Sequence, residues 1–158
     1  MRDTSYFVSY AHRDSKLVQQ LLELLTPLFK TSRAFRYLGW IDRGLVVGEK
    51  WHERIQTEIA ASDFGMIMVS PDLLASDYIT ANELPFFVGS GTKPIVPIGL
   101  KPIDSARQDL KGLADHQIFR LDRKHSFSEL VGARREAFAL QLFGQIEDRI
   151  GALRSHAI

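Results

Sequence analysis

Short apolar runs alternate with segments of helical periodicity about five times along the chain, and this alternation restricts the fold more than any other feature. Five runs are short and rich in β-branched or aromatic residues, and they are expected to be strands: 6–10, 37–41, 65–69, 94–100 and 117–121. Four segments with apolar residues at helical spacing are expected to be helices: 15–29, 51–60, 78–88 and 133–153. The pattern indicates one α/β domain over residues 1–158, with a parallel sheet between two layers of helices.

The order of these elements predicts a flavodoxin-like, doubly wound, five-stranded parallel sheet, because right-handed crossovers favour this topology. The run 65–69 is the most continuously apolar and is expected at the centre of the sheet. In such sheets ligands bind beyond the carboxyl ends of the strands. The loops that begin at Ser9, Asp42 and Ser70 are therefore candidates for a binding site, together with the adjacent helix that carries Glu83.

Local signals set the boundaries of several elements. Asp14 or Ser15 is a suitable cap for the first helix, because a short polar side chain can accept a hydrogen bond from an unpaired N–H. Pro85 interrupts the helix expected at 78–88 and disfavours helical backbone in the residue before it. The prolines of the segment 94–100 favour an end or edge position for that strand.

Composition excludes several kinds of chemistry. The chain has no cysteine, so disulfides, thiolate metal sites and cysteine nucleophiles are absent, which agrees with a cytoplasmic location. Its formal net charge is +1, so bulk charge favours neither a nucleic acid nor a membrane as a direct partner. No apolar run approaches the ~20 residues of a membrane helix, and the opening M-R-D-T-S does not fit a signal peptide.

Several known signatures of cofactor and metal sites are missing. The sequence contains neither of the glycine-rich phosphate-binding loops and no G-x-S-x-G nucleophile elbow. Its five histidines do not have zinc-binding spacing, so we expect no structural metal and no cofactor. A solvated face is expected for the basic residues near the end, since no ladder of aromatic residues accompanies them: Arg120, Arg123, Lys124, Arg134 and Arg135.

Three segments carry polar groups where the predicted sheet would place a site. In F-V-S-Y-A-H-R-D (7–14), hydroxyls and an imidazole follow the end of an expected strand and could belong to a site. The alternative is that the segment is only a strand, a turn and a helix cap. I-D-R-G-L-V-V-G-E-K-W (41–51) holds three apolar residues, 45–47, that either contact a partner or fold back onto the domain. S-P-D-L-L-A-S-D-Y-I-T-A-N-E-L (70–84) holds Glu83 among apolar residues. Apolar surroundings raise the pKa of a carboxyl group, and carboxyl groups with shifted pKa values are concentrated in functional sites, although a solvated helix glutamate is the commoner case.

Together these segments resemble a Toll/interleukin receptor homology (TIR) domain. F-V-S-Y-A-H-R-D is similar to the first box of the family, and I-D-R-G-L-V-V-G-E-K-W is similar to the second. V-S-P-D-L-L-A-S-D-Y-I-T-A-N-E-L is similar to the third strand and the glutamate helix, especially of bacterial members, and K-P-I-V-P-I to the fourth strand. The resemblance covers roughly residues 5–150, with all segments in the order of the family.

The resemblance implies two kinds of function. Many bacterial, plant and some animal TIR domains cleave NAD between nicotinamide and ribose, often in anti-phage or cell-death systems, so NAD would be a substrate and not a cofactor. Others are assembly modules that pair with further TIR domains. In the enzymatic members one glutamate on this helix is catalytic, and the matching residue here is Glu83. By the same resemblance the nucleotide pocket would be lined by Ser9, Tyr10, Asp42, Arg43, Gly48, Trp51 and Tyr78.

The role of Glu83 is chemically reasonable, because cleavage of an N-glycosidic bond builds positive charge on the ribose that a carboxylate can stabilise. The sequence departs from the family at one neighbouring position. Many members have an aromatic residue four positions before the glutamate, where this chain has Ile79, and its aromatic residue is Tyr78. A five-residue step on a regular helix ends ~140° away, so Tyr78 and Glu83 would point apart unless Tyr78 precedes the helix.

Two functions therefore stay open. One is an NAD glycohydrolase or cyclase, and the other is a non-catalytic interaction module that works through residues 43–48 and adjacent helices. A phospho-acceptor receiver domain is rejected, because the first strand ends in Ser9 and Tyr10 and the third in Ser70, where a receiver needs acidic residues. Since a lone TIR domain rarely has a sensor of its own, we expect either the N-terminal part of a longer protein or a subunit that answers to a partner, with self-association switching on the enzyme.

Overall fold

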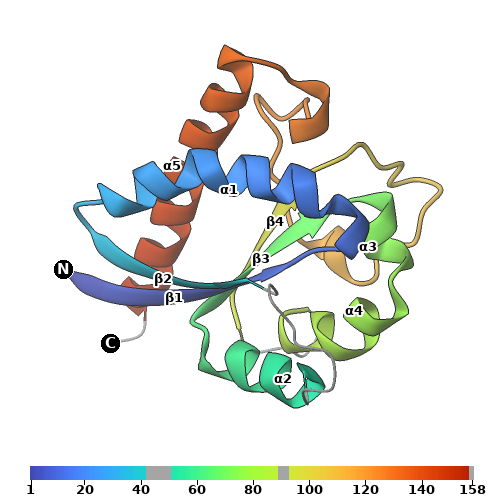
Figure 1. Ribbon diagram of the computed structural model, residues 1–158, viewed down its shortest axis with the longest axis horizontal. Helices are drawn as coiled ribbons and strands as arrows, with labels where there is room; N and C mark the ends of the chain where they lie inside the picture. Colours follow the sequence, from blue (N-terminus) through green and yellow to red (C-terminus); the bar gives the residue numbers. More distant parts are fainter. Residues whose placement is uncertain (42–50, 89–92, 157–158) are drawn as a thin grey trace.

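The computed structural model describes residues 1–41, 51–88 and 93–156. Its parallel strands are β1 (Arg2–Ser9), β2 (Phe35–Ile41), β3 (Phe64–Val69) and β4 (Ile95–Gly99). The helices are α1 (Ser15–Lys30), α2 (Trp51–Ala61), α3 (Pro71–Ala75), α4 (Asp77–Asn82) and α5 (Ala133–His156). Short 3-10 turns lie at η1 (His12–Asp14), η2 (Leu84–Phe86), η3 (Leu113–Asp115) and η4 (Phe127–Glu129). The sheet order β2-β1-β3-β4 is that of a doubly wound α/β domain (Figure 1).

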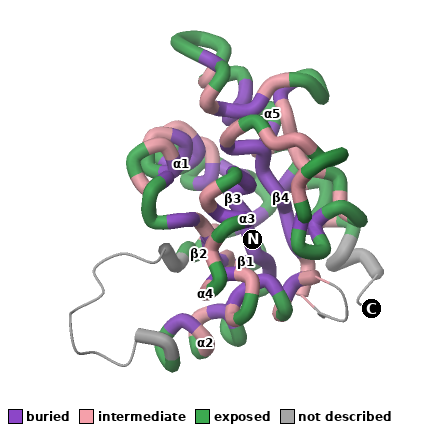
Figure 2. The backbone as a smooth tube through the Cα atoms, turned by 90° about the vertical axis from the view of Figure 1, so that its right-hand side faces the viewer, coloured by how far each residue is buried: buried purple, intermediate pink, exposed green. Residues whose placement is uncertain are grey.

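Two layers of helices cover the sheet, with α1 and α5 on one face and α2 and α4 on the other (Figure 1). Strand β3 shows why both layers are needed, because all its side chains are buried and they alternate between the faces. Met66 and Met68 join the core cluster of α1 and α5, whereas Ile67 and Val69 join the cluster of α2, α3 and α4. The prediction of a central, fully buried strand is confirmed, and Figure 2 shows the buried residues gathered along the strands.

The expected fifth strand at 117–121 is wrong among the described residues, because it is reduced to one bridge between Phe119 and Ile98. The Phe119 N–H donates to Pro97 O at 2.8 Å, and Gly99 N–H donates to Phe119 O at 2.7 Å. The next bond toward the amino end would need an N–H on Pro97, which proline lacks. In the other direction Leu121 N–H turns back to His125 O at 2.8 Å. The sheet therefore has four strands and a single bridge, and not the five strands that the apolar pattern suggested.

The helix boundaries follow local chemistry, with one correction. Helix α5 begins after Gly132, as predicted, and this glycine has a φ of 56° that favours glycine at the turn. Helix α4 ends at Asn82, and Pro85 lies in the 3-10 turn that replaces the second half of the expected helix. Asp14 occupies the cap position of α1, but its side chain makes no capping bond, so the expected side-chain cap is wrong.

A hydrogen bond between β2 and α5 should make the free energy of unfolding depend on pH in the alkaline range. Tyr37 Oη donates to Glu147 Oε2 at 2.5 Å, and burial and this bond raise the pKa of Tyr37 above its usual value of 10.0. A raised folded-state pKa gives stability that is present below the unfolded-state pKa and is lost as the pH rises. We therefore expect the free energy of unfolding of Tyr37→Phe, measured with urea, to fall less steeply than that of the wild type above about pH 10. An equally steep fall in both proteins would contradict this.

Candidate functional site

Ser9 and Glu83, which lie far apart in the sequence, meet at the carboxyl end of β1. The Ser9 hydroxyl donates to Glu83 Oε1 at 2.6 Å, and both residues are buried, with relative exposures of 1% and 4%. Glu83 follows the last residue of α4, and its N–H closes the helix by donating to Ile79 O at 3.0 Å. The arrangement fixes one carboxylate oxygen at the edge of the sheet where doubly wound folds bind their ligands.

Two short helices position Glu83, and serine caps define both. Ser70 Oγ accepts from Leu73 N at 3.0 Å and begins α3, directly after the end of β3. Ser76 ends α3 and begins α4, where its Oγ accepts from Ile79 N at 3.3 Å. This sequence of caps is why the chain can turn twice within a few residues and still satisfy its backbone N–H groups.

The residues that follow Glu83 hold it from the other side. Leu84 and Phe87 are buried, with exposures of 1% and 2%. The Phe87 ring lies so close to Gly65 that a Cβ atom there would come within 2.6 Å of it. Gln56 of α2 also donates to Asn82 O at 2.9 Å, which satisfies a carbonyl at the end of α4. Glu83 therefore lies between two anchored segments and cannot move as a free surface side chain would.

The other predicted site residues come from several elements of the chain. Tyr10 packs against the core cluster of α1 and α5, which lies on the opposite face of the sheet from α4. Tyr78 is the second residue of α4, so it does not precede the helix. It packs against the cluster of α2, α3 and α4. Trp51 begins α2, and its side chain lies outside the described part. Three further residues, Asp42, Arg43 and Gly48, lie outside the described residues.

A second polar cluster, with a buried carboxylate at its centre, lies at the same edge of the sheet, and the sequence pattern did not connect its residues. The Ser70 hydroxyl donates to Asp14 Oδ2, and Lys101 Nζ lies 2.6 Å from Asp14 Oδ1. The hydrogen bond to Asp14 holds the pKa of Lys101 above its usual value. The sequence offers Asp14 or Ser15 as a cap of α1, and nothing in it connects Asp14 with a lysine beyond the fourth strand. The available signal was that Ser70 and Lys101 follow adjacent strands of the sheet.

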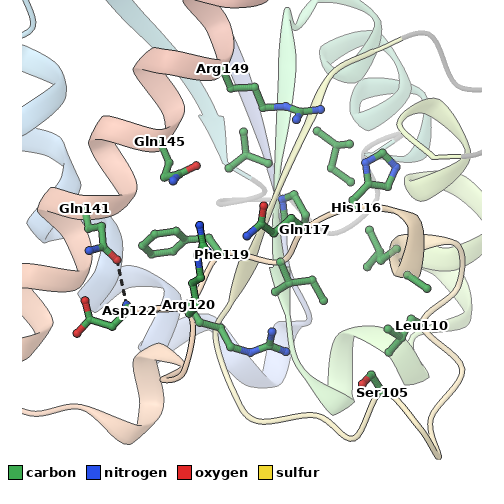
Figure 3. Close-up of a pocket in the computed structure, with 17 residues that line it drawn as sticks. Ser105, Leu110, His116, Gln117, Phe119, Arg120, Asp122, Gln141, Gln145 and Arg149 are labelled. Atoms are coloured by element: carbon green, nitrogen blue, oxygen red, sulfur yellow. Dashed lines mark hydrogen bonds between the residues drawn. The ribbon is translucent and has the colours of Figure 1, made fainter.

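A large cavity lies elsewhere, beside the outer edge of β4 (Figure 3). It encloses about 810 Å³ between β4, residues 105–123 and α5, and its lining includes neither Ser9 nor Glu83. Gln117 lies in its middle, and Arg120 and Arg149 reach into it from different elements (Figure 3). Because neither Ser9 nor Glu83 lines this cavity, we do not place the candidate chemistry there.

Comparison with known proteins identifies relatives over much of the chain. The family model of the TIR domain matches residues 7–132. The Uncharacterized protein y4lF of Sinorhizobium fredii (strain NBRC 101917 / NGR234) is 34% identical over 103 residues, which cover 63% of this chain and 31% of that protein. The match thus spans about a third of the length of this curated relative. Among the helices of the described residues, none has the length and apolar character that crossing a bilayer requires.

Proposed function

This chain belongs to the TIR domain family, which includes enzymes that cleave NAD, and we propose that it is an NAD glycohydrolase or ADP-ribosyl cyclase. The observation that carries the proposal is the buried Glu83 carboxylate, held by Ser9 at the carboxyl end of β1. A glutamate on the solvent-facing side of a helix is normally exposed, whereas Glu83 is only 4% exposed. Carboxylates withdrawn from water in this way concentrate in functional sites.

The proposed reaction breaks the bond between the nicotinamide nitrogen and C1′ of ribose. Nicotinamide leaves with the bonding electrons and becomes neutral, so the departing group needs no proton. Positive charge develops on C1′ and the ring oxygen, and the Glu83 carboxylate stabilises it or holds the ribose hydroxyls. Water then adds to C1′ and releases its proton, which gives ADP-ribose. In the cyclase alternative a nitrogen of the adenine of the same molecule adds to C1′ in place of water.

Direct product analysis tests the proposal. The purified protein is incubated with NAD in dilute solution and again after forced clustering, and nicotinamide, ADP-ribose and cyclic products are separated by chromatography. We expect nicotinamide release that increases with clustering. Absence of nicotinamide in both conditions, with any activating partner supplied, would overturn the proposal.

Ser9→Ala is expected to lower kcat for nicotinamide release about tenfold, because Glu83 loses the hydroxyl that fixes its Oε1 atom. The matched control is Ser62→Ala, which also removes a buried hydroxyl bond, that of Ser62 Oγ to Glu58 O at 2.6 Å. Ser62 precedes β3, at the opposite end of the sheet from the candidate site. Steady-state kinetics should therefore separate the two variants, and an equal loss of kcat in both would mean that Ser9 acts only through stability.

We also propose that the enzyme works in bacterial defence against phage and is activated by self-association with other TIR domains. The similarity to a protein of Sinorhizobium fredii supports a bacterial setting, and membership of the TIR family, in which many domains pair with one another, supports self-association. A sensor domain or subunit would supply the signal, and no direct binding to nucleic acid or membrane is proposed.

The alternative of a non-catalytic interaction module depends on residues 43–48, including the apolar residues 45–47, which lie outside the described residues. Light scattering of the protein with glycine at 45–47 tests that contact, because surviving association would exclude it.

A further inference from the structure

We propose that Asp14, Ser70 and Lys101 form a buried link that positions the Glu83 carboxylate against the end of β1. These three residues, called here the Asp14 link, would be positioning residues for cleavage of NAD and would not touch the substrate. The inference rests on the proposed function, and it adds residues from two further strand ends to the same site. It follows from the burial of the Asp14 carboxylate and from the two segments that its hydrogen bond with Ser70 ties together.

The Asp14 carboxylate is removed from water and is compensated by only a few groups. Its side chain is 0% exposed, and its Oδ2 atom accepts from the hydroxyl of Ser70. Among the described residues no hydroxyl or backbone N–H donates to Oδ1, so the Lys101 ammonium at 2.6 Å is the contact that compensates this oxygen. A buried carboxylate without such partners is strongly unfavourable. The link therefore depends on Lys101, even though the lysine side chain is 34% exposed.

The link and the Ser9–Glu83 bond join the same two segments of the chain. Residues 9–14 run from the end of β1 into α1, and residues 70–83 run from the end of β3 through α3 and α4. One connection lies at the start of the second segment, at Ser70, and the other at its end, at Glu83. The second segment is thus fixed to the first at both ends.

The helices between these two connections are too short to hold their own position. Helix α3 has 5 residues and α4 has 6, whereas isolated helices shorter than about 12 residues are marginal in water. Ser70 orients the first turn of α3 by accepting from Leu73 N, and Ser76 joins α3 directly to α4. A shift of Ser70 would therefore reach Glu83 through a chain of short, capped turns.

Lys101 extends the link to the next strand and to α3. It follows the end of β4, and its N–H donates to Val69 O at 3.2 Å. Its ammonium lies 3.8 Å from Asp72 Oδ2, so one cation contacts a carboxylate on α3 as well as Asp14. The raised pKa of Lys101 agrees with a cation that is held by these carboxylates. Three neighbouring strand ends are thereby tied to the segment that carries Glu83.

The test compares Lys101→Met with the double variant Asp14→Asn/Lys101→Met. The single variant leaves a buried carboxylate unpaired, whereas the double variant removes both charges and keeps an oxygen for the Ser70 hydroxyl. Lys111→Met is the matched control, because Lys111 has a similar side-chain exposure of 38% and pairs with the exposed Asp109. All variants are assayed for nicotinamide release after clustering and for amide hydrogen exchange of peptides from residues 70–88.

We expect Lys101→Met to lower kcat about tenfold with little change in KM, and to speed exchange in residues 70–83 more than in α5. The double variant should recover exchange protection and most of kcat, and Lys111→Met should resemble the wild type. An unchanged kcat in Lys101→Met, or faster exchange spread evenly over the chain, would overturn the inference. If Lys101→Met does not fold, the double variant Asp14→Asn/Lys101→Met provides the test. Fast amide exchange of residues 70–83 in the double variant would then contradict the inference. Absence of nicotinamide release by the wild type would instead count against the proposed function, while the exchange comparison would still decide whether the link exists.

Discussion

Glu83→Gln is expected to lower kcat for nicotinamide release by about a thousandfold. Glutamine has nearly the same size as glutamate, and its carbonyl oxygen can still accept the hydrogen bond that Ser9 donates at 2.6 Å in the wild type. The substitution therefore removes the negative charge with little change in packing. Because the positive charge on the ribose exists only as the bond to nicotinamide breaks, the loss should appear in kcat more than in KM.

The control for this variant is Glu136→Gln on α5, where the residue is exposed and lies outside the candidate site. Both variants should unfold at urea concentrations close to that of the wild type, which separates a chemical effect from a loss of fold. If Glu83→Gln kept more than about a tenth of the wild-type kcat, the carboxylate would not be the catalytic group. Such a result would leave the domain as a binding or assembly module with a buried structural glutamate.

The largest expected loss of stability comes from Phe138→Ala, which should reduce the free energy of unfolding by about 3–5 kcal/mol. Phe138 of α5 is 0% exposed, and its ring meets Phe119 and Phe127 with centroid distances of 4.9 and 5.3 Å. Removing the ring opens a cavity between α5 and the single bridge that replaces a fifth strand. Neither neighbouring ring can collapse fully into this space without leaving its other contacts.

Leu140→Ala provides the matched comparison, because Leu140 lies two positions further along α5 and is 60% exposed. This change should alter the free energy of unfolding by less than about 0.5 kcal/mol. Urea unfolding of both variants at one pH gives the difference directly. Equal effects would mean that the packing of α5 on Phe119 contributes little, and that the sheet edge is held by other contacts.

Most of the fold could be predicted from the sequence, because the strands and long helices carry strong apolar periodicity. The fully buried run of β3 and the start of α5 after Gly132 are clear examples. The fifth strand could not be judged from its own residues, because its length depends on a partner strand in which Pro97 lacks an N–H. Residues 117–121 have the apolar pattern of a strand, but the edge of β4 could not provide the continuous row of backbone hydrogen bonds that a fifth strand needs.

The candidate site was predictable only in part. Ser9 and Glu83 could be placed at one edge of the sheet, since Ser9 lies at the end of the first expected strand and Glu83 on the helix that follows the third. The Asp14 link could not, because an aspartate that caps a helix and a buried aspartate that pairs with a lysine look alike in the sequence, and Lys101 lies far beyond Asp14 in the chain. Tyr10 directly follows β1 and packs against the cluster of α1 and α5.

The incomplete edge of β4 has a consequence for how copies of this protein can join. Pro97 offers no N–H, and the N–H of Gly99 is already bonded to Phe119 O. An approaching strand would find no continuous row of donors there, so β4 resists extension by another chain, which is the route by which exposed sheet edges form fibrils. At this side of the sheet, copies of the chain that approach one another would meet side chains and not a row of free backbone donors among the described residues.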